Sequence, residues 1–201
     1  MKKITVPDRI LLLITGLLAA YQISFGLYEI NPLATWSYTI GFGVLLVAGL
    51  LLIILGFEGL ESQVVVIVSS LIPLSISLGL VAEHLPQFTI PYLVFALLGF
   101  AAIAITRYTA EGKTATIILA ITHGIAGSLI TFLPVILSIQ GIVPGGYSLV
   151  GVAGALIGVG GLLLAFLKAG KPILSQKMIL TVLPALLLLM TAAFVYGFSF
   201  S

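Results

Sequence analysis

The sequence predicts an all-α integral membrane protein, built as a seven-transmembrane-helix bundle. Of its 201 residues, 61% are hydrophobic and only 7% are charged, whereas about 25% of the residues in an ordinary soluble domain are charged. Seven runs contain no Asp, Glu, Lys or Arg, and most approach the roughly 20 apolar residues that a helix needs to cross a bilayer. The third observation is that all basic residues fall on one side of such a bundle.

The expected spans cover, in order, residues 10–28, 38–57, 64–82, 90–106, 115–139, 149–167 and 178–198. We expect helices because barrel strands would alternate apolar and polar residues, which these runs do not. The first span follows Lys2 and Lys3 and therefore resembles a signal peptide in outline. Asp8 interrupts that basic leader, and Leu18 stands where a cleavage site needs a small residue. We expect this span to be a helix of the mature protein.

Aromatic residues mark the outer ends of the second and sixth spans. Trp36 and Tyr38 lie at the start of the second span, and Tyr147 precedes the sixth. Amphipathic rings gather at the boundary between lipid and water, so we expect these three side chains at the outer interface. Glu83 and His84 follow the third span, and we expect them to form a solvated cap rather than an acid–base pair.

Prolines lie inside the third, fifth and seventh spans, at Pro73, Pro134 and Pro184. Each removes a helix hydrogen bond and tends to bend the helix, which either provides a hinge for transport or is compensated by a neighbouring helix. The sixth span carries four glycines on one face: Gly151, Gly154, Gly158 and Gly161. That face either packs tightly against another helix or forms a groove for an acyl chain, an isoprenoid tail or a pigment ring.

The charges predict both the number of spans and their orientation. With seven spans, one side holds every basic residue: Lys2, Lys3, Arg9, Arg107, Lys113, Lys168, Lys171 and Lys177. Loops rich in Lys and Arg stay in the cytoplasm, so the N-terminus is predicted to be cytoplasmic and the C-terminus outside, in a multi-pass protein of the cell membrane. Glu29 and Glu83 fall on the outer side. Six or eight spans would scatter the basic residues.

The chain is expected to form a single transmembrane domain over residues 1–201, with a candidate internal repeat. Residues 8–85 align with residues 115–199 around a linker helix at 89–107; Pro73 matches Pro184, and all offsets lie between 107 and 113 residues. Such a repeat predicts two parallel triplets of helices in a 3+1+3 arrangement, as in some transporters. Chance similarity is the alternative, because chains rich in Leu, Gly and Ala align easily with themselves.

Composition excludes or disfavours several kinds of chemistry. The chain has no cysteine, which excludes disulfides and thiolate metal sites, and a net charge of +2 gives no reason to expect nucleic acid as a partner. No charged residue lies near the middle of a span, which disfavours ion-driven pumping. The two histidines, His84 and His123, differ in depth by about 15 Å, which argues against one haem bound by both. No metal site is expected, and the sequence assigns no cofactor.

His123 is the deepest ionisable residue, about nine residues or 13 Å from the inner end of the fifth span. It shares a helix face with small and polar residues, including Gly127 and Thr131. We therefore expect a ligand-binding site at His123, Gly127 and Thr131, together with Gly154 and Gly158 of the sixth span. Three roles fit the imidazole: a hydrogen bond to a neighbouring helix, a contact with a quinone carbonyl, lipid headgroup or transported solute, or ligation of a haem or chlorophyll.

Two functions fit these features, and neither is enzymatic. The first is a non-catalytic subunit of a larger membrane complex of the respiratory or photosynthetic type, in contact with the lipid bilayer, other membrane subunits or a lipophilic cofactor. It explains the short loops and the lack of buried charge. The second is a small facilitative transporter of a neutral or amphipathic solute, which explains the candidate repeat and the matching prolines. An electron-carrying haem protein and an enzyme with its catalytic groups in loops are weaker alternatives.

Overall fold

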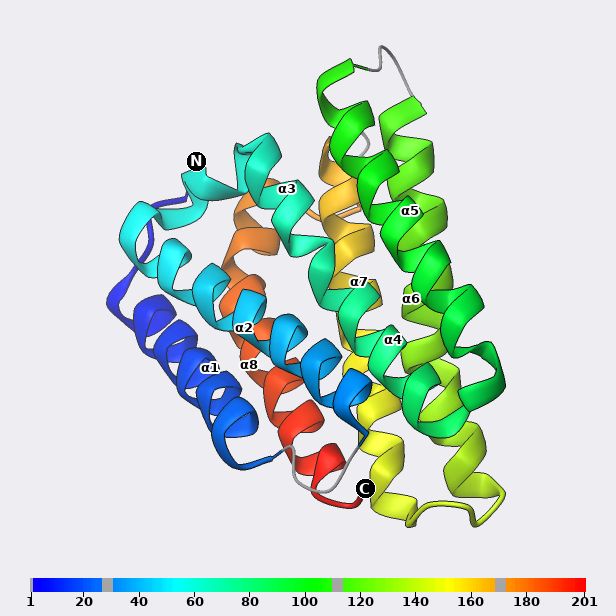
Figure 1. Cartoon of the computed structure of the whole chain (residues 1–201). Helices are drawn as coiled ribbons and strands as arrows, with labels where there is room; N and C mark the ends of the chain where they lie inside the picture. The colour runs from blue at the N-terminus through cyan, green and yellow to red at the C-terminus, as the bar shows by residue number, and fades with distance from the viewer. Residues whose placement is uncertain (1, 27–30, 110–113, 169–172) are drawn as a thin grey trace.

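The computed structural model describes residues 2–26, 31–109, 114–168 and 173–201, and these form helices with no strand among them (Figure 1). The long helices are α1 (Val6–Phe25), α2 (Pro32–Leu55), α3 (Gln63–Ser69), α4 (Leu71–His84), α5 (Thr89–Thr109), α6 (Thr114–Ile139), α7 (Ser148–Lys168) and α8 (Gln176–Phe198). Short 3-10 helices form η1 (Gly56–Glu61), η2 (Pro86–Phe88) and η3 (Gly145–Tyr147).

Six segments of the described chain are long and apolar enough to cross a membrane. The remaining predicted span corresponds to α7, which has 21 residues. Together with the turn before it, α7 forms a shorter apolar segment over Gly145–Gly161. The predicted all-α membrane bundle is thus confirmed. Residues 27–28, at the end of the first predicted span, lie outside the described residues.

The second span begins earlier than predicted because its N-terminus is capped. The Asn31 side chain accepts a hydrogen bond of 2.9 Å from the backbone N–H of Ala34, and Pro32 occupies the first turn, where a missing N–H costs nothing. The Asn31 amide also donates to the carbonyl of Ala82 at 2.8 Å. The cap therefore ties the outer end of α2 to the outer end of α4.

The third span is divided into α3 and α4 at Ser70. Pro73 follows three residues later and has no N–H to donate to the carbonyl of Ser69, so one hydrogen bond of a continuous helix is missing there. The Ser70 hydroxyl instead donates to the carbonyl of Ile67 at 2.6 Å. Pro134 and Pro184 differ from Pro73, because Pro73 lies in the first turn of α4 whereas each of the other two lies in the interior of an unbroken helix.

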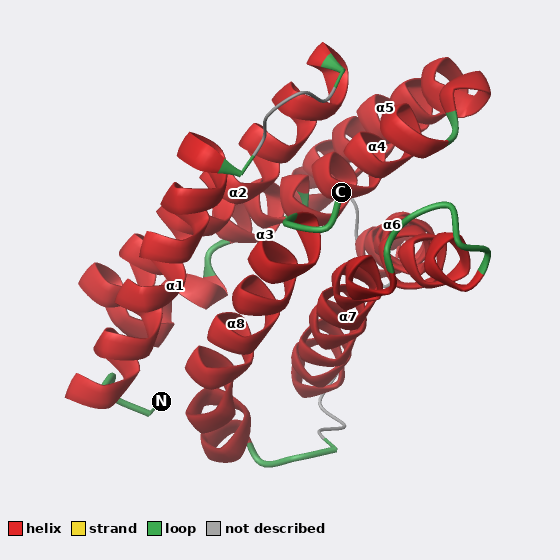
Figure 2. Cartoon of the chain, turned by 90° about the horizontal axis from the view of Figure 1, so that it is seen from below, coloured by secondary structure: helices red, strands yellow, loops and turns green. Residues whose placement is uncertain are grey.

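Six of the spans form a closed ring, in the order α1, α2, α4, α6, α7, α8 and back to α1. Helix α5 lies outside this ring and packs against α3, α4 and α6 (Figures 1 and 2). The first three ring members come from the N-terminal part of the chain and the last three from the C-terminal part. The predicted linker helix is therefore the one helix outside the ring.

The buried apolar core changes along the length of the bundle. Toward the outer end, one cluster draws residues from all six ring helices, among them Ala19, Tyr38, Ile76, Leu133, Val150 and Phe194. At the inner end, a second cluster joins α1, α2, η1 and α8 around Phe57. A third joins α4, α5 and α6 around Ala126. Among the described residues, the core thus crosses the whole ring only toward the outer end.

The two termini lie at opposite ends of the bundle. The N-terminus lies at the end that carries η1 and the start of α6, and the C-terminus lies at the other end (Figure 1). An odd number of crossings requires this separation. Lys113, Lys171 and Glu29 lie outside the described residues, and which end is cytoplasmic stays a prediction.

Candidate functional site

The five residues predicted to bind a ligand lie on two helices that pack against each other, α6 (His123, Gly127 and Thr131) and α7 (Gly154 and Gly158). In the outer half of the seam between them the two helices touch closely. A Cβ atom added to Gly151 would come within 2.5 Å of the Thr131 carbonyl oxygen, and one added to Gly154 would come within 2.7 Å of the Ile130 side chain. The hydroxyl of Thr131 donates to the carbonyl of its own helix at Gly127, at 2.8 Å. This half of the glycine face is therefore a helix-packing contact.

The inner half of the same seam is open. A Cβ atom added at Gly127, Gly158 or Gly161 would meet no atom within 4 Å, and Gly158 and Gly161 are exposed. Because these two glycines share a helix face with Gly151 and Gly154, the face that packs against α6 continues inward into unfilled space. Tight packing thus occurs in the outer half of the seam, and a groove is available in the inner half.

His123 lies at the level of this open half and is partly buried. Its Nδ1 atom is buried and has no hydrogen-bond partner in the described part of the chain. The carbonyl of Leu119, one turn earlier, is near the ring but does not meet the geometry of a hydrogen bond with Nδ1. The ring also lies within electrostatic reach of Arg107 on α5.

Arg107 was predicted as a charge of the inner loops, and the structure gives it a different environment. It is partly buried, and its Nε atom is buried without a hydrogen-bond partner. It lies one turn beyond Ile103, which is 1% exposed, and residues four apart share a helix face. The guanidinium therefore extends from the packed face of α5. The sequence did contain a signal for this position. The connection between α5 and α6 is short, so the end of α5 that carries Arg107 must lie beside the start of α6.

A second polar cluster closes the outer end of the ring. The Tyr38 hydroxyl of α2 donates to Glu83 Oε2 of α4 at 2.8 Å, and His84 Nε2 and the Tyr147 hydroxyl of η3 lie 2.8 Å apart. His84 Nε2 and Glu83 Oε2 are separated by 3.8 Å. The ring of Phe198 in α8 lies against both tyrosines, with centroids 4.7 Å from Tyr38 and 6.1 Å from Tyr147. The cluster therefore joins three of the ring helices, α2, α4 and α8, to η3.

This cluster corrects two sequence predictions. Tyr38 and Tyr147 were expected at the lipid–water interface but are both 0% exposed, and the Glu83 and His84 side chains, expected to be solvated, are 16% and 11% exposed. Tyr38 is buried because its ring packs against Gly79, where no side chain stands in the way. Trp36, two residues before Tyr38, is 67% exposed, which agrees with its predicted place at the interface.

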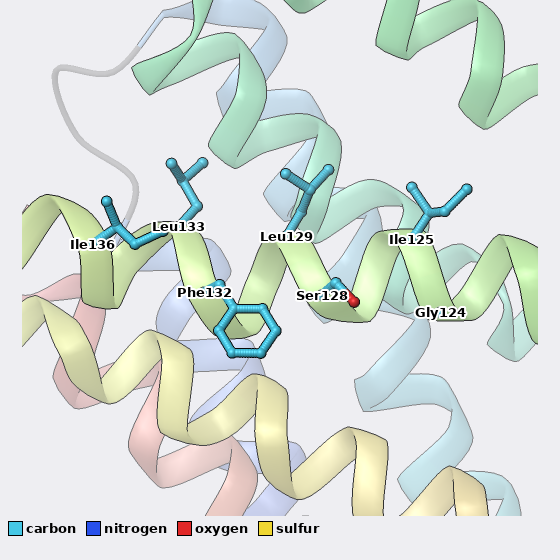
Figure 3. A pocket seen from close by; sticks show the side chains of 7 residues that line it. All are labelled: Gly124, Ile125, Ser128, Leu129, Phe132, Leu133 and Ile136. Atoms are coloured by element: carbon cyan, nitrogen blue, oxygen red, sulfur yellow. The ribbon is translucent and has the colours of Figure 1, made fainter.

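The outward face of α6 carries a shallow apolar trough of about 490 Å³ (Figure 3). Its lining comes from one helix alone: Gly124, Ile125, Ser128, Leu129, Phe132, Leu133 and Ile136. Gly124 and Ser128, four residues apart and both exposed, keep its inner part low, and a Cβ atom at Gly124 would meet nothing within 4 Å. The trough offers one hydroxyl and otherwise hydrocarbon, so it suits an apolar helix or chain.

The N-terminal segment is anchored at the inner end of the ring. Lys2 Nζ lies 2.8 Å from the Asp8 carboxylate and 5.3 Å from the centre of the Phe57 ring. Asp8 also accepts from the Thr5 N–H at 2.9 Å, as the second half of a capping box at the start of α1. These contacts join the chain start to α1 and η1 and pair Lys2 with Asp8.

No group of three or more His, Cys, Asp or Glu side chains that would hold a metal ion occurs among the described residues. The chain matches no known protein family, and comparison with curated proteins and solved structures found no significant similarity. The apolar helices identify a multi-pass membrane protein.

Proposed function

We propose that this chain is a non-catalytic subunit of a larger membrane complex and that the α6 trough receives a transmembrane helix of a partner. The observation that carries the proposal is the exposed series Ala120, Gly124 and Ser128, spaced four residues apart on α6. Small residues at this spacing let two helix backbones approach closely in a membrane, where packing rather than water drives association.

The glycine in this series supports a partner rather than lipid alone. A glycine inside a helix costs roughly 0.5–1 kcal/mol relative to alanine, and Gly124 makes no close contact within this chain that would require it. Helix α5, beside the trough, is also sparsely packed, since only Ala96 and Ile103 of its 21 residues are buried. The α5–α6 side of the bundle is therefore the side with most room for another subunit.

A photoreactive residue placed in the trough tests this proposal. Benzoylphenylalanine at Phe132, which is 61% exposed, is expected to cross-link in native membranes to one discrete membrane protein at high yield. The same residue at Ile54 of α2, 74% exposed, is the control and should give only diffuse lipid adducts. Gly124→Leu should abolish the Phe132 cross-link. Lipid or pigment adducts alone at Phe132, or a cross-link insensitive to Gly124→Leu, would contradict the proposed partner helix.

The second candidate function is the facilitative transporter, and the ring order supports it. If α1, α2 and α4 correspond to α6, α7 and α8, then every pair of neighbouring helices in the ring corresponds to another pair of neighbours. A parallel 3+1+3 repeat requires this correspondence. The core also crosses the ring only toward the outer end among the described residues. This combination suits a bundle closed outside by the tyrosine cluster and able to open inward.

Transport is testable in liposomes that contain the purified chain. If the second candidate holds, osmotic swelling in glycerol or glucose should be faster than in protein-free liposomes, and His123→Ala should slow it at an unchanged yield of folded protein. Swelling equal to that of protein-free liposomes would remove these solutes from consideration, and swelling unaffected by His123→Ala would exclude the assigned role of that residue.

A further inference from the structure

Two buried nitrogen atoms with no hydrogen-bond partner lie in the inner halves of α5 and α6. They are Arg107 Nε and His123 Nδ1, the two buried side-chain polar atoms of the described chain that lack a partner. An unpartnered donor in an apolar environment costs free energy. Helix α5 packs against α6, and the two side chains are close enough to interact electrostatically, so one ligand could contact both.

The charge of the site selects an oxyanion. A guanidinium cannot be deprotonated in a protein, and its planar array of N–H groups matches the oxygens of a phosphate. Among the residues described, Arg107 has no carboxylate within ion-pair distance, whereas Lys2 at the same end is paired with Asp8 at 2.8 Å. Basic side chains between transmembrane helices on the cytoplasmic side are typical binding positions for anionic lipid headgroups.

The depth of the two residues matches a phospholipid. Arg107 lies two residues from the inner end of α5 at Thr109, and His123 lies nine residues from the inner end of α6 at Thr114, or about 13 Å along the helix. Arg107 thus lies near the headgroup region of the inner leaflet, and His123 lies deeper. The open glycines Gly127, Gly158 and Gly161 begin at the level of His123 and provide room for hydrocarbon.

We propose that the inner half of α6, between Arg107 of α5 and the open glycines of α7, binds one anionic phospholipid. Arg107 binds its phosphate, the ring of His123 hydrogen-bonds to its glycerol-ester region, and an acyl chain lies against Gly127 and Gly158. His123 and Gly127 are not part of the trough lining, so this site differs from the surface proposed for the partner helix. Lipid binding is therefore testable on the solitary chain, and its failure would leave the partner proposal standing.

Native mass spectrometry of the purified chain in neutral detergent measures this binding directly. With dioleoyl phosphatidylglycerol we expect one tightly bound lipid per chain and at least tenfold higher affinity than for dioleoyl phosphatidylcholine. Arg107→Gln should reduce this preference to less than about twofold, and Arg107→Lys should retain most of it. The matched control is Arg9→Gln, which removes an exposed arginine at the same end of the bundle and should leave the preference unchanged.

A second pair of variants tests the acyl-chain groove without any change of charge. Gly158→Leu fills the open seam and should weaken binding of both lipids at least tenfold. Gly43→Leu adds the same side chain at another open position, on α2, and should have no effect. Circular dichroism and size-exclusion chromatography establish that each variant is folded. If Arg107→Gln does not fold, the proposal is still tested by the Arg107→Lys and Gly158→Leu variants.

Three results would overturn the proposal. The first is equal affinity of the wild-type chain for the two lipids. The second is an equal loss of preference in Arg107→Gln and Arg9→Gln, which would indicate general attraction to a basic surface. The third is displacement of phosphatidylglycerol by millimolar inorganic phosphate that itself binds through Arg107, which would identify a soluble anion instead of a lipid.

Discussion

Substitution of Tyr38 by phenylalanine tests whether the outer polar cluster holds the ring together. The change removes one oxygen atom from a side chain that is 0% exposed and deletes the 2.8 Å hydrogen bond from its hydroxyl to Glu83. The ring and its contact with Phe198, at 4.7 Å between centroids, remain. The measured effect is therefore that of the hydrogen bond rather than of the packing.

The expected loss of stability is about 1–2 kcal/mol. Hydrogen bonds between membrane helices average about 0.6 kcal/mol and reach about 1.7, and bonds that leave a buried partner unsatisfied cost about 1–3 kcal/mol. The Glu83 side chain is 16% exposed, so water replaces the lost donor only in part. This places Tyr38→Phe in the upper part of the range for membrane helices.

The assay is unfolding of the purified chain in mixed micelles by increasing mole fractions of dodecyl sulfate, followed by circular dichroism. Tyr196→Phe is the control, since Tyr196 is 61% exposed and should change the stability by less than about 0.5 kcal/mol. A double-mutant cycle with Glu83→Ala should give a coupling energy of about 1 kcal/mol. Equal stability of Tyr38→Phe and wild type, or a coupling energy near zero, would refute the role given to this hydrogen bond.

Two further predictions concern the packing and the orientation of the bundle. Gly79→Ala should destabilise the chain by about 1–3 kcal/mol, because the new Cβ would overlap the Tyr38 ring, whereas Gly43→Ala, at an open position, should be nearly neutral; equal effects in the same unfolding assay would contradict the packing. The chain has no cysteine, so single cysteines report its topology. A membrane-impermeant maleimide should label Ser201→Cys in intact cells and Lys3→Cys only after permeabilisation, and the reverse pattern would show that the orientation is wrong.

The number and position of the helices could be predicted from the sequence because each crossing needs its own long apolar run. The placement of the basic residues added a second, independent count. The helix ends were predicted less well, since α2 begins at Pro32, six residues before the start of the predicted span at residue 38. What these signals do not specify is which side of each helix faces another helix.

Burial in the outer cluster was mispredicted for a physical reason. In a soluble protein the apolar side of a helix faces inward, but lipid is as apolar as a protein interior, so that pattern is lost in a membrane. From the sequence, Tyr38 and Tyr147 were therefore predicted to lie at the lipid–water interface, although both are fully buried. Arg107 was predicted to be a charge of an inner loop, because the sequence does not show which side of α5 faces another helix. Its Nε atom is buried in the structure.

The sequence by itself determined that this protein is a membrane bundle, how many helices it has, and that the inner half of α6 carries a histidine beside glycines. The tertiary structure decided that the glycine face of α7 meets closed packing at Gly154 and open space at Gly158, and that α5, which carries Arg107, packs against α6, which carries His123. Such relations arise from contacts between helices far apart in the chain, which local composition does not encode. The membrane fixes each helix as a crossing element, and interhelical packing then decides where a ligand can bind.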